Sequence, residues 1–343
     1  MESATPSSKV GQTRVHRLSA SETVAMLRDG YLTVSDYAER LLSRVSERND
    51  MVNAWAYLDP SLVMEQARRL DAIPANERGP LHGVAVGIKD ILTTRDMPTR
   101  YGSPIFQNDE RTSVDATAVL ILRSAGALIF GKTRTTEPAA YNGVYGIKPT
   151  WGAVATQGMS QFSPTCDTLG FFARTLQDLE LLASVFRFPL QRNQISTANG
   201  DLRVAFLKTA AWEKAEPSLQ EAWEDCKTSF GQLGISYADV VLPQEFANLQ
   251  LEGWHDDILT FEAQRTFLGV RRLEKKDCFN SMWTLLHAPI INVPGLKGKA
   301  GLPLGLSVVG SRYEESKVFR AAQFLADVFC QERSLQPEVV KGQ

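Results

Sequence analysis

The chain has 343 residues, of which 43% are hydrophobic and 22% are charged, and its net charge is −2. These are ordinary globular values, and they allow a sizeable core in two domains or in one large α/β domain. The balanced charge gives no basic patch for nucleic acid, and no run of eighteen apolar residues predicts a membrane span. We therefore expect neither nucleic acid nor a membrane as a partner.

The amino-terminal segment is polar and rich in serine. Residues 1–12 lack the apolar core of a secretory signal, and residues 1–15 are expected to form a disordered tail. The cysteines and histidines lie far apart, without Cys-x-x-Cys or His-Glu-x-x-His spacing, so we expect no disulfide framework and no metal site. Isolated thiols suit a reducing compartment, and we expect a cytoplasmic location. These residues are Cys166, Cys226, Cys278, Cys330, His16, His82, His255 and His287.

Residues 17–71 have the apolar spacing of helices. Ser19, followed three residues later by Glu22, predicts a capping box at the start of the first helix. A second helix is expected from about Ser35, and a third over residues 62–72.

After Gly79-Pro80 the pattern changes to that of alternating helices and buried strands. This order is typical of an α/β sheet with crossover helices. The first pair of strands is expected at 84–88, which ends in Lys89-Asp90, and at 127–130, which ends at Gly131. Further strands are predicted at 201–207 and 304–309, helices at 115–126, 175–186, 218–233 and 316–329, and a loop at 294–303.

Three sequence blocks carry a family resemblance. Residues 81–90 are Leu-His-Gly-Val-Ala-Val-Gly-Ile-Lys-Asp, residues 127–133 are Ala-Leu-Ile-Phe-Gly-Lys-Thr, and residues 143–150 are Gly-Val-Tyr-Gly-Ile-Lys-Pro-Thr. The third block continues to Arg174 and contains Asp167-Thr168-Leu169-Gly170. These blocks resemble those of the amidase signature family, serine hydrolases that cleave carboxamides. The resemblance implies an α/β fold with a mixed sheet flanked by helices and truncated in the centre.

The segment that carries the nucleophile in this family has no counterpart here. In the family, a long Gly/Ser-rich segment separates the second and third blocks, and it holds the nucleophilic serine, a bridging serine and the oxyanion-hole N–H groups. In this chain only residues 134–142 lie between them. A second gap is expected at 269–278, between segments that resemble a substrate-covering helix and the block after it. We therefore predict one domain over residues 16–343 with two internal deletions.

Lys89 is the one catalytic residue of the family that this sequence matches. A lysine at the end of a buried strand is unusual, because lysine is rarely buried unless it is paired. Asp90 follows it and points to the opposite face of a regular strand, so it is a poor partner for that amine. A lysine acts as a general base only when its pKa falls toward about 7–8. The resemblance implies this role for Lys89, with no cofactor.

Other nucleophiles near these blocks are Ser103, Ser160, Ser163 and Cys166. Nothing in their spacing brings them within the hydrogen-bonding reach of a base, so we expect structural roles for them. The segment Pro164-Thr165-Cys166-Asp167 resembles stand-alone small-amide amidases more than the synthetase-like subunits of tRNA-dependent amidotransferases that share the family blocks.

The resemblance implies an amidase that hydrolyses carboxamide C–N bonds through a serine acyl-enzyme. Without either serine, the chain is expected to be catalytically impaired. One alternative is a pseudoenzyme that binds a small amide in a pocket with Lys89, Tyr145 and Trp151. Another is a truncated product that folds poorly. The sequence leaves open the substrate, the pathway and whether the chain forms a homo-oligomer.

Overall fold

The computed structural model describes residues 15–103, 106, 112–134, 139–188, 190, 204–244, 246, 250–267, 280–298 and 301–335. The chain divides into two compact units. Unit 1 comprises Met1–Glu137, Val154–Ser160 and Glu180–Arg187, and unit 2 comprises Pro138–Ala153, Gln161–Leu179 and Phe188–Gln343.

Unit 1 begins with helices whose ends are capped by side chains. After the short helix η1 (Val15–Arg17), they are α2 (Ala20–Arg28), α3 (Val34–Val52) and α4 (Pro60–Asp71). The predicted capping box is confirmed, since the Glu22 N–H donates to Ser19 Oγ at 3.1 Å and the Ser19 N–H donates to Glu22 Oε2 at 2.7 Å. Asp71, at the end of α4, accepts the N–H of Val34 at 2.7 Å and so holds the start of α3.

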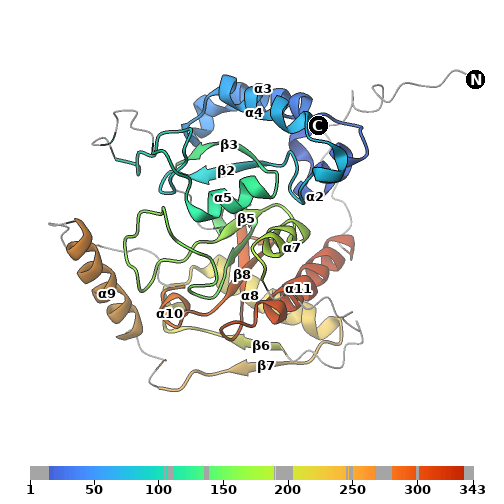
Figure 1. Cartoon of the computed structure of the whole chain (residues 1–343). Coiled ribbons are helices and arrows are strands. Elements are labelled where there is room, and N and C mark those ends of the chain that lie inside the picture. The colour runs from blue at the N-terminus through green and yellow to red at the C-terminus, as the bar shows by residue number, and fades with distance from the viewer. Residues whose placement is uncertain are drawn as a thin grey trace, which may run out of the picture. The chain divides into compact units, whose positions relative to one another are not determined.

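A three-stranded sheet forms the centre of unit 1. Its order is β1 (Trp55–Tyr57), β3 (Leu128–Thr133) and β2 (Ala85–Lys89). β2 and β3 are parallel, and α5 (Thr117–Ser124) connects them, whereas β1 is antiparallel to β3. Within this unit α3 and α4 lie on one side of the sheet and α5 on the other (Figure 1). The short helix η2 (Ala75–Glu77) precedes β2.

β3 runs through Gly131 to Thr133, so the prediction that the strand ends at Gly131 was wrong. A Cβ atom at Gly131 would lie 2.9 Å from the carbonyl oxygen of Tyr57 and 2.9 Å from the ring of Trp55. The glycine therefore allows β1 to approach closely, and it does not end the strand.

Unit 2 contains a four-stranded sheet of order β5 (Phe171–Ala173), β4 (Tyr145–Lys148), β8 (Ile290–Lys297) and β9 (Pro303–Val309). All neighbouring strands are antiparallel. Helix α11 (Glu315–Leu335) packs along β8 (Figure 1).

The first part of the predicted loop at 294–303 is strand instead. β8 passes through Pro294, which pairs with Gly305, and the register shifts before Leu296. Proline removes one N–H from a ladder and is tolerated at bulges and edges. β4 pairs with β8 only over residues 290–292, so the ladder to β4 has ended before Pro294.

The other elements of unit 2 are mostly short. β6 (Val204–Leu207) and β7 (Tyr237–Val240) form a parallel pair that α8 (Pro217–Gln232) connects. α7 (Leu176–Val185) crosses the boundary between the two units along the chain. The remaining elements are α6 (Ala139–Asn142), η4 (Ala210–Lys214), α9 (Gln250–Phe267) and α10 (Ser281–Leu285).

The mixed α/β fold class is confirmed for the residues that the structure describes. Three expectations concern other residues: most of the tail at 1–15, residues 135–138 of the first short link, and the link at 269–278 lie outside the described residues. The single domain with two deletions stays a prediction. Across the described ranges, none of the helices combines the length and the apolar character needed to span a bilayer.

Candidate functional site

Lys89 is the last residue of β2, and it lies where two parallel strands end together. It is half-buried and pairs in register with Thr133, the last residue of β3. Its carbonyl oxygen accepts the N–H groups of Ile91 at 2.8 Å and Leu92 at 3.0 Å, so the chain turns immediately. The carboxyl ends of parallel strands are where α/β proteins place ligand-binding groups.

Asp90 does not face the same way as Lys89. Its carboxylate is buried and accepts the N–H of Arg100 at 3.1 Å and that of Gly102 at 3.4 Å. It also forms an ion pair with Lys132, whose Nζ lies 3.5 Å from Oδ1. The two ends of the loop after β2 are thus joined through one carboxylate.

Lys132, on β3, is a fully buried lysine that the sequence did not single out. Its Nζ donates to Leu92 O at 2.8 Å, Thr99 Oγ1 at 2.6 Å and Pro98 O at 3.4 Å. Burial lowers the pKa of Lys132 to about 8, and the opposing effect of Asp90 limits the fall. The available signal was a lysine directly after a run of apolar residues. Ending the strand at Gly131 placed Lys132 outside it.

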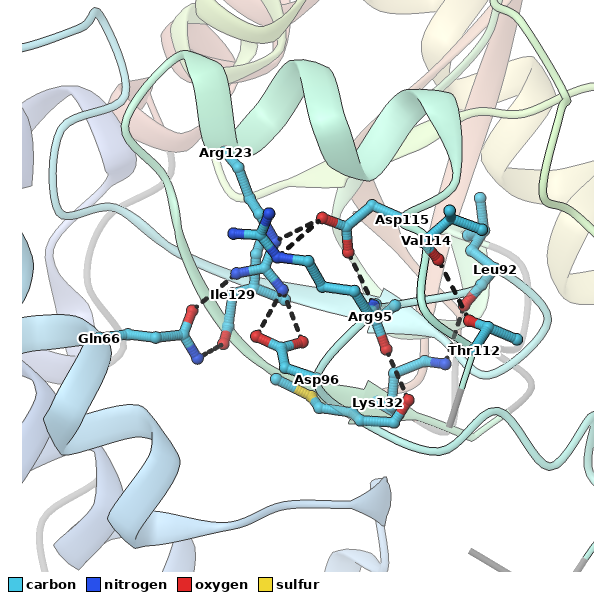
Figure 2. A network of polar contacts seen from close by, with 12 residues as sticks. Gln66, Leu92, Arg95, Asp96, Thr112, Val114, Asp115, Arg123, Ile129 and Lys132 are labelled. Atoms are coloured by element: carbon cyan, nitrogen blue, oxygen red, sulfur yellow. Dashed lines mark hydrogen bonds and ion pairs between the residues drawn. The ribbon is translucent and has the colours of Figure 1, made fainter. Parts of the chain in front are cut away.

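A second cation holds the same loop from α5 (Figure 2). The Arg123 guanidinium donates to both carboxylate oxygens of Asp96, at 2.7 and 2.8 Å, and forms an ion pair with Asp115 at 3.1 Å. It also donates to Gln66 of α4 at 3.0 Å, and Gln66 donates to Ile129 O at 3.3 Å. The loop, α4, α5 and β3 are therefore linked by one polar network.

Two of the alternative nucleophiles lie in unit 1. The Ser160 N–H donates to Ile91 O at 2.9 Å, and the preceding Met159 pairs with Leu92. The Ser103 N–H donates to Arg100 O at 2.9 Å. Both backbones are thus held beside the turn or loop that follows Lys89, whereas Ser163 and Cys166 belong to unit 2.

In unit 2, Ser163 and Cys166 are both buried in the loop that follows Gln161. The Ser163 hydroxyl donates to the carboxylate of Glu262 on α9, so its proton already has an acceptor. Cys166 is a free thiol with 5% of its surface exposed. These positions agree with the structural roles expected for both residues.

Glu262 joins α9 to this loop. Besides the Ser163 hydroxyl, its carboxylate accepts the Thr165 N–H at 3.1 Å and the Thr165 hydroxyl. Burial alone would raise the pKa of Glu262, but the hydrogen bonds from Ser163 and Thr165 hold it below its ordinary value. Asp167 completes the loop by accepting the N–H groups of Phe162 at 2.6 Å and Ser163 at 2.9 Å.

An aromatic pair supports the other side of the same loop. Trp151 stacks on His287 with ring centroids 5.0 Å apart, and its Nε1–H donates to Pro164 O at 3.1 Å. His287 Nε2 lies 2.8 Å from Thr165 O. Trp151 and Tyr145 belong to unit 2 and Lys89 to unit 1. The histidine was not recognised from the sequence because the residues it contacts are remote along the chain.

Unit 1 also contains a cavity of about 260 Å³ that Lys89 does not line. Asp71, Arg78 and His82 form its polar wall. Asp71 is already used at the start of α3, and burial lowers the pKa of His82, which favours a neutral imidazole. Across the described residues, no group of three or more His, Cys, Asp or Glu side chains is placed to hold a metal ion.

Comparison with known proteins follows the same division of the chain. The family described as Amidase matches residues 36–137 and, separately, residues 135–266. The amidase-like component of the glutamyl-tRNA(Gln) amidotransferase from Salinispora tropica is 28% identical over 299 residues, which cover 66% of this chain and 61% of the relative. The chain thus spans about three fifths of the length of this curated relative.

Solved structures share the fold. A peptide amidase from Stenotrophomonas maltophilia aligns over 92% of this chain and 97% of its own, with a TM-score of 0.72 and 18% identity. A fatty acid amide hydrolase aligns over 95% of this chain and 87% of its own, with a TM-score of 0.69 and 16% identity. The predicted likeness in fold is therefore confirmed.

Proposed function

Because the chain belongs to the amidase family, we propose that its reaction class is the hydrolysis of carboxamide C–N bonds, and that it is impaired in this reaction. In the proposed mechanism Lys89 is the general base, no cofactor takes part, and the serine that would form the acyl-enzyme is missing. A nucleophilic serine needs an adjacent base to remove its proton, and an amine of lowered pKa can serve as that base.

One observation carries this proposal: the two family matches meet at residues 135–137. β3 ends at Thr133 and β4 begins at Tyr145. The Gly/Ser-rich segment of the family belongs in this interval, and the interval is too short to contain it. Loss of a catalytic serine costs a rate factor on the order of 10⁶. Loss of one oxyanion-hole donor costs about 10²–10³. The two losses are not additive, but together they leave a rate near background.

The position of Lys89 supports its assignment as the base. It ends a strand beside Thr133, it is half-buried, and its carbonyl oxygen begins a hydrogen-bonded turn. Such an amine is partly removed from water and is presented by a rigid element. These are the conditions under which a lysine loses its proton at moderate pH.

The substrate class we propose is a small free carboxamide. Its support is the segment Pro164-Thr165-Cys166-Asp167, which resembles stand-alone amidases, and the short link at 269–278, where the family has further substrate-covering residues. The thiols of Cys166 and Cys226 are free, which supports the reducing cytoplasm as the compartment.

The experiment is to insert the Gly/Ser-rich segment of a related amidase after Glu137 and to measure ammonia release from a panel of small amides. Four proteins are compared: the chain as it stands, the chain with the insertion, and each of these with Lys89→Ala. We expect turnover only with the insertion and Lys89 together. The result against the proposal is enzyme-like turnover by the chain without the insertion. Single variants of Ser103, Ser160, Ser163 and Cys166 would then identify the nucleophile.

A further inference from the structure

The turn after Lys89 is held by a buried amine. Lys132 is in register with Ile88, and Thr133 is in register with Lys89. Side chains alternate along a strand, so Lys132 and Asp90 share one face of the sheet while Lys89 occupies the other. The 3.5 Å separation of Lys132 Nζ from Asp90 Oδ1 agrees with this alternation.

The three N–H donors of Lys132 are all used on the loop that Lys89 begins. Leu92, at 2.8 Å, lies in the turn itself, and Pro98 and Thr99, at 3.4 and 2.6 Å, lie on the returning arm. An ammonium group has three donors and no acceptor, so these three oxygen atoms satisfy it fully. One side chain therefore connects the outgoing and returning arms of the loop.

The charge of Lys132 is compensated in the same place. Asp90 supplies the opposite charge, and its carboxylate also accepts the Arg100 N–H at 3.1 Å. Asp96 acts on Lys132 from farther away and, like Asp90, opposes the lowering of its pKa by burial. The pKa of about 8 leaves most of the Lys132 amine charged at neutral pH.

Arg123 holds the loop at a different point. It contacts Asp96, several residues beyond Lys89, and its side chain retains 14% exposure, whereas Lys132 has none (Figure 2). Of the two cations, only Lys132 bonds to the turn that begins at the Lys89 carbonyl.

We propose that Lys132 is a positioning residue for Lys89: by binding Leu92, Pro98 and Thr99 it fixes the turn at the end of β2 and thereby sets the direction and solvation of the Lys89 amine. This inference rests on the proposed role of Lys89 as the base. It acts through the backbone, since the two lysine side chains lie on opposite faces.

The test measures Lys89 directly in the full chain and does not need turnover. Acetic anhydride modifies lysines only in their neutral form, and peptide mass spectrometry gives the rate for the peptide that contains Lys89. The rate is followed from neutral to alkaline pH in the unaltered chain, Lys132→Met and Thr99→Val. The matched control is Lys148→Met: Lys148, in unit 2, is also buried with a pKa lowered to about 8, and it donates to Ala288 O at 2.5 Å.

We expect the midpoint of the Lys89 profile in Lys132→Met to rise by roughly one pH unit, because a freed turn lets water reach the amine. Thr99→Val removes one acceptor of three and should give a smaller rise in the same direction. Lys148→Met should leave the Lys89 midpoint unchanged. Thr99→Val provides the readout even where Lys132→Met does not fold.

Three results overturn the inference. The first is an unchanged Lys89 midpoint in Thr99→Val and in folded Lys132→Met. The second is an equal shift in Lys148→Met, which would indicate general destabilisation. The third is an ordinary lysine midpoint for Lys89 in the unaltered chain, which would also remove the proposed base. The first two results leave the proposed function intact, so the two failures are distinguishable.

Discussion

Glu262→Ala is the perturbation that best tests how the loop after Gln161 is held in unit 2. The carboxylate of Glu262 accepts three hydrogen bonds, from the Ser163 hydroxyl, the Thr165 N–H and the Thr165 hydroxyl. Ser163 is fully buried and Thr165 is half-buried. Truncation therefore leaves one donor without access to water, while the two donors of Thr165 recover part of their solvation.

The magnitude follows from these three donors. A buried donor left unsatisfied costs about 1–3 kcal/mol, and a net hydrogen bond to a charged group contributes about 1.5–3 kcal/mol. Since Thr165 is partly solvated, its two bonds count for less than the full amount. We expect Glu262→Ala to lower the free energy of unfolding of unit 2 by about 2–4 kcal/mol. Ser163→Ala alone should cost less, because it removes the donor together with its need for a partner.

The assay is urea unfolding monitored by tryptophan fluorescence, because Trp151 donates to Pro164 O in the same loop. A double-mutant cycle of Glu262→Ala and Ser163→Ala isolates their interaction, for which we expect a coupling energy above about 1 kcal/mol. A loss below about 0.5 kcal/mol for Glu262→Ala, with no coupling, would refute the reasoning. It would mean that α9 is not energetically tied to the loop.

Three further changes test other features. In acid, the chain should lose stability that Glu262→Gln lacks: the folded pKa of Glu262 is below its ordinary value, so its contribution is full above the unfolded pKa of about 4.3 and is lost as the pH falls through the folded pKa. Urea titrations at several acidic pH values measure this. Gly170→Ala should destabilise unit 2 by about 1–3 kcal/mol, since its Cβ would lie 2.3 Å from Ile147 O, and a thermal melt that matches the unaltered chain would contradict it. Lys132→Met should cost about 3–5 kcal/mol by leaving Asp90 as a buried unpaired charge, and Lys132→Met with Asp90→Asn should cost less than the sum of the single changes, in the same unfolding assay.

The helices of unit 1 could be predicted because their signals are local. The capping box uses Ser19 and Glu22, three residues apart, and the apolar faces of α3 and α4 repeat within a few turns. The strand before Lys89 was also local, an apolar run that begins after a change of period. Patterns of this kind depend on neighbours in the sequence, so one sequence is enough to show them.

The short strands could not be predicted, because their partners define them. β1 is three residues between two helices, and β5 is three residues whose register is set by β4. Pro294 indicated a loop, yet β8 continues through it, since β4 no longer pairs at that point. Tertiary pairing overrides propensity in such segments.

The candidate site divides in the same way. Lys89 was found through a family block, whereas Lys132 lay in another block and was missed because Gly131 suggested a strand end. The Ser163 to Glu262 contact joins residues 99 positions apart, and neither residue has a neighbour in the sequence that indicates the other. A buried polar network needs its partners to be known in space before any member can be recognised.

The polar network of unit 1 bears on which form of an impaired amidase this chain is. The contacts of Lys132 with Leu92, Thr99 and Asp90 all lie within unit 1, and none of them uses the interval between Thr133 and Tyr145. Absence of the nucleophile segment, as we propose, therefore removes chemistry without removing the support of Lys89. A buried lysine and a buried aspartate would strongly destabilise the unit if either lacked its partner, and here each has the other. This argues for a folded chain whose activity an insertion can restore. The poorly folded alternative requires that the purified chain show no cooperative melting.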